Sequence, residues 1–158
     1  MAAADVNGDG KADIVTGAGP GGGPHVEVFD GATNAVLRSF FAYGAGFTGG
    51  VWVAAGDVNG DGKAEIITGA GAGGGPHVRV YNGADNALLA SFFAFGGAFT
   101  GGVRVSVADA NNDGKAEVVV AQGAGGAPRV RLLNPLTMQS YQDFNAYDPG
   151  FLGGVFVG

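Results

Sequence analysis

The chain contains 158 residues, of which 46% are apolar, and its formal net charge at pH 7 is −6. This length and apolar content suffice for the core of one domain, whereas the absence of cysteine excludes a disulfide framework. The sequence has neither an apolar run of about 18 residues for a transmembrane helix nor a basic patch for nucleic acid. The first residues, Met1–Asp5, lack the basic and apolar regions of a signal peptide.

One sequence pattern recurs at a fixed interval of 52 residues, and each copy predicts four short β-strands. In the second copy, β-branched and aromatic residues alternate with small or polar ones, and no helical spacing of about 3.6 residues appears. Asn82-Gly83 predicts a hairpin turn between the last two strands of that copy. The four predicted strands cover residues 51–55, 65–69, 77–81 and 88–93.

Four antiparallel strands in a period of about 40–50 residues are typical of a β-propeller blade. We therefore predict an all-β protein with three blades in a single domain, residues 1–158. The repeats are 1–52, 53–104 and 105–156, and the tail 155–158 repeats part of a first strand. Solenoids of the leucine-rich and β-helical types have shorter repeats, and helical repeats need helices, so an open array of β-strands is the remaining alternative.

Each copy places an acidic loop of nine residues between its first and second strands. The first loop reads Asp5-Val-Asn-Gly-Asp-Gly-Lys-Ala-Asp13, with side-chain oxygen donors at positions 1, 3, 5 and 9. Ca²⁺ prefers such hard oxygen ligands, the backbone carbonyl at position 7 would complete the shell, and glycine at position 6 permits a sharp turn. The sequence predicts about one Ca²⁺ per repeat. The predicted ligands are Asp5, Asn7, Asp9, Lys11, Asp13, Asp57, Asn59, Asp61, Lys63, Glu65, Asp109, Asn111, Asp113, Lys115 and Glu117.

Three alternatives to a nine-residue calcium loop were open from the residues alone. An EF-hand needs an acid at position 12 between helices, whereas this position is Thr16, Thr68 or Val120 in a strand. Mg²⁺ demands a stricter octahedron than Ca²⁺. A metal-free turn rich in Asp, Asn and Gly would explain one copy, but three copies with identical donor positions favour metal. Nine of the 14 acidic residues lie in these loops, so three divalent cations would bring the formal charge to about zero.

Two histidines, His25 and His77, open the third predicted strand of the first two copies. The sequence shows no cysteine, no second nearby histidine and no partner serine that would give them a metal-binding or catalytic role. Arg129 occupies the same position in the third copy. We therefore expect a structural role at the start of the strand.

Phenylalanines recur at fixed positions of the repeat and are expected to fill the core between blades. An alternative use of some of them, or of Trp52 and Tyr147, is a site on which sugars stack. The recurrent phenylalanines are Phe40, Phe41, Phe47, Phe92, Phe93, Phe99 and Phe151.

The whole pattern resembles the FG-GAP repeats of the integrin α-subunit N-terminal β-propeller and the related VCBS-type repeats of bacterial surface proteins. The likeness lies in the Asp-x-Asn-x-Asp-Gly-x-x-Asp/Glu loop and the Ile-Val-Thr-Gly-Ala or Ile-Ile-Thr-Gly-Ala strand after it. Phe95-Gly96, Tyr43-Gly44 and Gly17–Pro20 are similar to the motifs that name the family, the last with an extra glycine. The resemblance implies an extracellular or cell-surface propeller that calcium stabilises and that mediates adhesion or recognition.

The number of blades predicts the assembly. Closed propellers have about four to eight blades, so three blades leave the ring open and two chains would give six. We expect a homodimer that closes head to tail. Met1 stands in the register of Val53, and the tail 153–157 repeats residues 49–53, so one tail is expected to complete the partner's first blade. The alternative is a piece of a larger propeller with six or seven blades.

These features together predict a non-catalytic, calcium-binding module that acts as a structural scaffold or as an extracellular adhesion domain. The sequence shows no nucleophile elbow, no phosphate loop and no cluster of Lys, Arg and His that a propeller phosphatase would need. The alternative function is a calcium-dependent, carbohydrate-binding lectin with pockets between blades. We expect a protein or glycan ligand, no nucleic acid partner and no insertion into a membrane.

Overall fold

The strands form because β-branched residues alternate with polar ones over short segments. In β7 (His77–Tyr81), Val78 and Val80 are fully buried, while His77 and Arg79 are partly exposed, as a period of two requires. The computed structural model describes residues 1–158 and contains twelve strands and no helix, so no helix could cross a membrane. All four strands predicted for the second copy are present, and their ends differ from the prediction by at most one residue.

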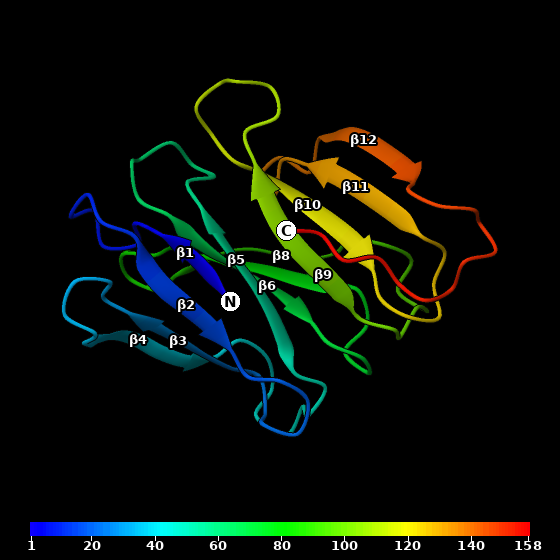
Figure 1. Cartoon of the computed structure of the whole chain (residues 1–158), viewed down its shortest axis with the longest axis horizontal. Coiled ribbons are helices and arrows are strands. Elements are labelled where there is room, and N and C mark those ends of the chain that lie inside the picture. The colour runs from blue at the N-terminus through cyan, green and yellow to red at the C-terminus, as the bar shows by residue number, and fades with distance from the viewer.

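The strands form three four-stranded antiparallel sheets, and within each sheet every strand pairs with its neighbours in sequence. Figure 1 shows the sheets side by side as three blades. The first strand of the second blade, β5, contacts the first strands of the other two, β1 and β9, and we call these three the inner strands. This confirms the predicted all-β blade architecture. The first blade contains β1 (Ala2–Ala4), β2 (Asp13–Gly17), β3 (His25–Phe29) and β4 (Val36–Phe41). The second contains β5 (Val51–Gly56), β6 (Glu65–Ala70), β7 and β8 (Leu88–Phe93). The third contains β9 (Val103–Ala108), β10 (Glu117–Gln122), β11 (Arg129–Leu133) and β12 (Ser140–Asn145).

The hydrophobic core lies between successive blades. Val15, Val26 and Val28 of the first blade are fully buried in one cluster with Ile66 and Tyr81 of the second. An equivalent cluster joins the second blade to the third. Burial of each such valine or isoleucine side chain contributes about 1.5–3 kcal/mol relative to exposure. The stability of a blade therefore depends on its neighbour.

The two outer faces of this array are open. Ile14 is 37% exposed, whereas Ile66 and Val118 at the same repeat position are fully buried. At the other end every residue of β12 is exposed, and the tail covers only part of the face, where Val155 is buried. The three blades thus form an open arc with an unfilled apolar face at each end.

The expectation that the recurrent phenylalanines fill the core is wrong for three of them. Phe41, Phe93 and Phe151 are about half exposed. Phe41 and Phe93 are the last residues of the outermost strands β4 and β8, and Phe151 lies outside the strands. Phe47 and Phe99 are partly buried and lie over glycine-rich loops. The aromatic side chains buried between blades are those of Tyr81 and Phe95.

The turn between the third and fourth strands also differs from the predicted Asn-Gly hairpin. In the second blade the Asn82 amide donates to the Ala87 carbonyl, which closes a longer loop. Asn86, with a φ of 66°, takes the left-handed conformation, and Gly83 does not. The third blade forms the same turn although Pro135 replaces that glycine. The first position of the turn is Asp30, Asn82 or Asn134, whose side-chain oxygen accepts backbone hydrogen bonds in all three blades, so the turn needs this acceptor rather than the freedom of glycine.

Replacing Ile66 by alanine tests the placement of the core. We expect Ile66→Ala to lower the free energy of unfolding by about 2–5 kcal/mol, because the cavity would open in a fully buried cluster. Phe41→Ala removes a larger side chain that is 55% exposed, so we expect a loss of less than about 1 kcal/mol. Urea denaturation of both variants measures the difference, and equal losses would contradict this core.

Candidate functional site

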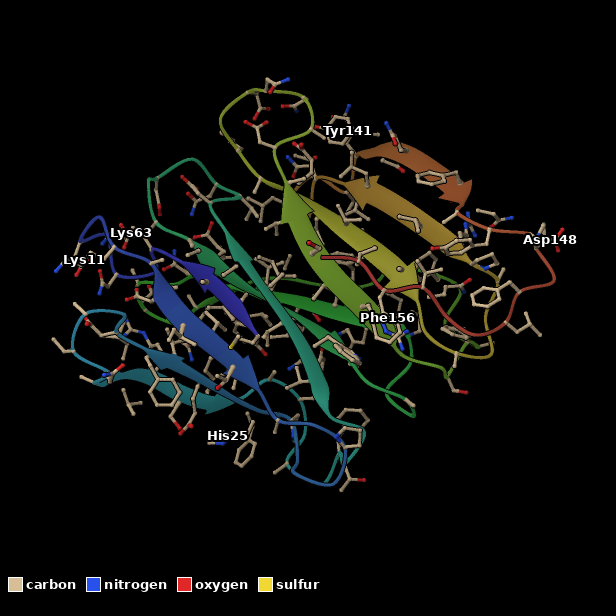
Figure 2. All side chains as sticks on the ribbon, in the orientation of Figure 1. Lys11, His25, Lys63, Tyr141, Asp148 and Phe156 are labelled. Atoms are coloured by element: carbon tan, nitrogen blue, oxygen red, sulfur yellow. The ribbon has the colours of Figure 1, made fainter.

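The three acidic loops connect β1 to β2, β5 to β6 and β9 to β10, at the same end of each blade. Lys11 and Lys63, which mark the first two loops, lie near each other in Figure 2. The glycine at position 6 of each loop has a φ of 83° or 84°, so it makes the sharp turn that the sequence predicts. The six-residue start of the loop therefore has one conformation in all three blades.

The carboxylate at position 1 holds the loop through backbone amides. Asp5 Oδ1 accepts hydrogen bonds from the amides of Gly8 (2.6 Å) and Asp9 (3.1 Å), and its Oδ2 accepts one from Gly10 (2.7 Å). Partial desolvation acts to raise the pKa of Asp5, but these amide hydrogen bonds and the nearby Lys63 hold it below its ordinary value. Asp57 makes all three equivalent hydrogen bonds, and Asp109 makes two of them, from the amides of Asp113 and Gly114.

The acid at position 9 is fully buried in each blade, which is unusual for a carboxylate. Asp13 Oδ2 accepts hydrogen bonds from the amides of Val6 (3.0 Å) and Asn7 (3.2 Å). Glu65 and Glu117 each accept one from the residue at position 2 of their loop, also at 3.0 Å. These bonds tie the start of the second strand back to the start of the loop.

In the second and third loops an asparagine amide lies between two acids. The Nδ2 of Asn59 donates to Glu65 Oε1 at 2.9 Å and to Asp61 Oδ2 at 3.1 Å. Burial, together with the charges of Asp61 and Asp57, raises the pKa of Glu65 to about 7. Two carboxylates thus converge on a group that carries only partial positive charge.

The third loop repeats this arrangement and the first loop departs from it. Asn111 Nδ2 lies 2.9 Å from Asp113 and 3.2 Å from Glu117. In the first loop the acid at position 9 is the shorter Asp13, and Asn7 Nδ2 instead reaches Asp30 at 3.4 Å. The change of Asp to Glu at position 9 therefore alters which acids meet.

The donor chemistry of the loops fits a divalent cation. Each loop gathers carboxylate and amide oxygens within nine residues, and in two loops a pair of acids converges on a neutral amide N–H group. The structure contains no group of three or more His, Asp or Glu side chains arranged to hold a metal ion. In the second and third loops the asparagine amide joins the predicted ligands at positions 5 and 9, whereas the acid at position 1 accepts hydrogen bonds from backbone amides.

The side chain of the lysine at position 7 contacts the preceding loop, whereas the sequence predicted a role only for its backbone carbonyl. Lys63 lies so close over Gly8 that a Cβ there would be 2.8 Å from Lys63 Cε, and Lys115 lies over Gly60 in the same way. The amide of the next residue, Ala64, donates to the Asp5 carbonyl at 2.7 Å. The acidic loops are therefore also joints between blades. The recurrence of lysine at a fixed position was the available signal.

Each histidine has a partner serine, contrary to the expectation from the sequence. His25 Nε2 lies 2.9 Å from Ser39 Oγ, and His77 Nε2 lies 2.8 Å from Ser91 Oγ, across neighbouring strands. Burial, assisted by Arg79, lowers the pKa of His77. No third group orients either pair as in a catalytic triad. The spacing of 14 residues, constant in the repeat, would have revealed the pairs.

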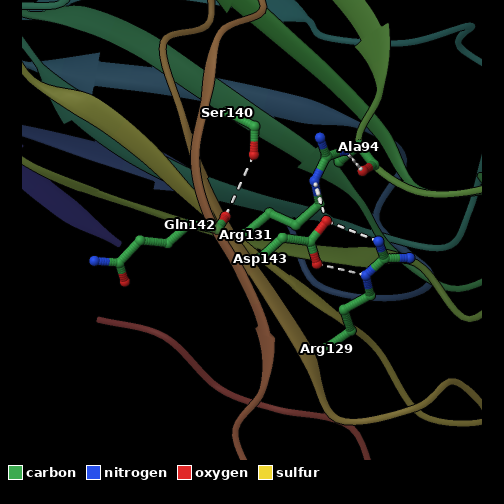
Figure 3. A network of polar contacts seen from close by, with 6 residues as sticks. All are labelled: Ala94, Arg129, Arg131, Ser140, Gln142 and Asp143. Atoms are coloured by element: carbon green, nitrogen blue, oxygen red, sulfur yellow. Dashed lines mark hydrogen bonds and ion pairs between the residues drawn. The ribbon is translucent and has the colours of Figure 1, made fainter.

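The third blade replaces the histidine–serine pair by an ion pair, which supports a structural role for this position. Arg129 donates to both carboxylate oxygens of Asp143, at 2.6 and 2.7 Å (Figure 3). Arg131 lies 3.2 Å from the same carboxylate and donates to the Ala94 carbonyl of the second blade. A position that accepts either pair links the two outer strands of a blade.

Residues 5–68 match a protein-family model described as an FG-GAP-like repeat. The matched segment spans the first two acidic loops and the strands between them. This confirms the resemblance seen in the sequence: residues 5–68 are similar to FG-GAP-like repeats, and the third blade has the same order of strands and loop. FG-GAP repeats are typical of extracellular proteins, and propeller domains of this family are generally non-catalytic. No curated protein matches the chain.

The raised pKa of Glu65 predicts how stability depends on pH in a metal chelator. The folded value of about 7 exceeds the ordinary 4.5, so the stability gained from the bound proton is present below pH 4.5 and is lost as the pH rises through 7. We expect the melting temperature of the wild type, relative to Glu65→Gln, to fall between pH 5 and pH 8. His77 has the opposite pH dependence in both proteins and cancels in the comparison. Parallel melting curves would contradict the assignment.

Proposed function

We propose that this FG-GAP-like repeat chain is a non-catalytic, calcium-binding β-propeller module. The observation that carries the proposal is the convergence of two acids, one of them fully buried, on a single amide nitrogen in the second and third loops. A buried carboxylate without a full positive partner is costly. A divalent cation held by the loop oxygens would neutralise this charge, and Ca²⁺ suits a loop with flexible geometry better than Mg²⁺ does.

The role of the metal in this proposal is structural. The acidic loop lies at a joint where Lys63 and the Ala64 amide of one blade contact the loop before it. An ion that fixes the loop would therefore fix the position of the next blade as well. Ion binding and the packing of the arc are coupled for this reason.

Calcium is expected to raise the thermal stability of the chain. Replacing EDTA by millimolar CaCl₂ should raise the melting temperature by about 5 °C or more, since binding to the folded state alone adds stability by mass action. Asp61→Ala should reduce the gain, whereas Asp85→Ala, in the β7–β8 turn, should leave it unchanged. An unchanged melting temperature in calcium would refute the proposal. Isothermal titration calorimetry should give about one Ca²⁺ per loop.

The biological use that fits such a module is that of a scaffold or an extracellular adhesion and recognition domain. The typical location of FG-GAP repeats supports this. A lectin is the second candidate, supported by exposed aromatic side chains such as Trp52 (42% exposed) and Tyr147 (61%). Binding to a glycan array, competed by a simple sugar, would favour the lectin, and protein capture without glycan binding would favour the adhesion domain.

We also propose that two copies close into one ring of six blades. One open end carries the donor, and the other the acceptor, of the backbone hydrogen bond that links successive blades within the chain. Within the chain the Ala64 amide donates to the Asp5 carbonyl, and the same bond joins the second and third loops. At the open ends the Ala12 amide and the Asp109 carbonyl, which stand at the same repeat positions, have no partner.

The inner strands carry a second pair of complementary edges. β5 pairs with β6 along six residues, whereas β1 pairs with β2 along three, so the rest of the inner edge of β2 is unpaired. The tail 155–157 stands in the repeat register of residues 51–53, and its only backbone hydrogen bond to a strand of its own chain runs from the Val155 amide to the Gln122 carbonyl at the end of β10. A partner's tail on the edge of β2 would satisfy both sets of backbone groups.

Light scattering in calcium tests the closure. We expect the wild type to have the mass of a dimer, and Ile14→Lys, on the open face of the first blade, to be a folded monomer. Leu88→Lys changes a side chain that is 51% exposed on β8 of the second blade, whose two faces already pack against the other blades of the chain, and this variant should remain a dimer. A wild type that is monomeric at micromolar concentration would overturn the closure without bearing on calcium binding.

A further inference from the structure

A pocket of about 290 Å³ opens where the glycine-rich loops of the three blades meet the first residues of the inner strands. These loops lie at the opposite end of the inner strands from the acidic loops. Its walls are mostly glycine and alanine, with Met1 from the first blade and Trp52 and Arg104 from the inner strands of the second and third blades. Arg104 is the only charged side chain in the lining, and no acid faces it there. The pocket therefore presents a guanidinium and no acidic side chain beside small residues.

The guanidinium of Arg104 contacts two neighbouring aromatic rings. Its guanidinium carbon is 5.1 Å from the centre of the Trp52 ring and 3.9 Å from that of Phe156. The two rings are 6.0 Å apart and meet edge to face. Phe156 belongs to the tail, which lies toward the middle of the molecule in Figure 2. Stacking of this kind holds the guanidinium plane in one orientation and leaves its N–H groups unused.

Arg104 is the only arginine of the chain whose side chain makes no hydrogen bond and no ion pair. Arg38, Arg79 and Arg131 each donate to a backbone carbonyl, and Arg129 pairs with Asp143. The Nε of Arg104 is buried without a partner. A guanidinium has five N–H donors, and none of those of Arg104 has a partner in the chain.

The repeat does not require an arginine at this position. Trp52 and Phe156 stand at the equivalent positions of the neighbouring repeats, and both are aromatic. The inner strand thus tolerates an apolar side chain there, and the arc would pack without a charge. Arg104 adds a planar, positively charged fork that the packing of the blades does not use.

We propose that this pocket binds a small molecule with one carboxylate on a six-membered ring. The carboxylate would accept two parallel hydrogen bonds from Arg104, a geometry that a guanidinium matches well. The ring would stack on Trp52, whose side chain is 42% exposed at the pocket. One guanidinium as the only charged side chain suits a monocarboxylate better than a doubly charged phosphate. Aromatic acids and hexuronic acids share this chemistry.

Calorimetric titration of the intact chain with sodium benzoate and sodium glucuronate tests the proposal, with benzamide and glucose as neutral matches. We expect at least one acid to bind with a dissociation constant of about 1 mM, and its neutral match to bind at least tenfold more weakly. Benzoate alone would assign aromatic acids, and glucuronate alone would assign acidic sugars. Binding of neither acid, or equal binding of acid and neutral match, would overturn the proposal.

Two substitutions of Arg104 separate binding from folding. Arg104→Gln removes the charge, and Arg104→Trp introduces the residue type that the second blade already carries at this position. Both should weaken acid binding at least tenfold, while Arg38→Gln, on β4, should leave it unchanged. Unchanged binding in both Arg104 variants would overturn the assignment. Calcium-dependent melting of the same proteins reports on the proposed metal function separately, since Arg104 lies outside the acidic loops.

Discussion

Each blade of this chain has an apolar face that only the next blade can bury. Val15 and Val28 of the first blade are inaccessible to water because Ile66 and Tyr81 of the second blade cover them. The same constraint explains the exposure of Ile14, which has the sequence position of a core residue and no blade in front of it. Packing between blades, rather than within a sheet, is therefore the interaction on which the stability of the array depends.

The acidic loops belong to this system of joints as well as to the proposed metal sites. A loop is held internally by the acid at position 1, and its position-9 acid is buried at the start of the second strand. The lysine at position 7 and the amide after it reach the preceding loop. The same few residues thus carry the acidic charge, the backbone hydrogen bonds and the packing contacts of the loop. Ion binding at such a place would act on the arrangement of blades and not only on the loop.

The third blade shows at which positions the fold tolerates a different residue type. Pro135 replaces a glycine in the outer turn without changing the turn, since Asn134 still caps it. Arg129 and Asp143 replace a histidine–serine pair across the same strands. Arg104 replaces an aromatic residue at the pocket, and it alone among these changes leaves its polar groups unpaired. The unpaired guanidinium of Arg104 is the observation on which the proposed ligand rests.

The sequence by itself determined the strands, the blades and the position of the acidic loops, because alternation with a period of two and a repeat of 52 residues are local signals. Only the tertiary structure decided which side chains meet. The exposed side of Phe41, the contact of Lys63 with Gly8, and the stack of Trp52, Arg104 and Phe156 all depend on how blades are placed relative to one another. The convergence of Glu65 and Asp61 on one amide, with the acid at position 1 turned to the backbone, depends on the three-dimensional course of the loop. Spacing along the chain shows that donors are near in sequence, but their orientation is set by packing and hydrogen bonds.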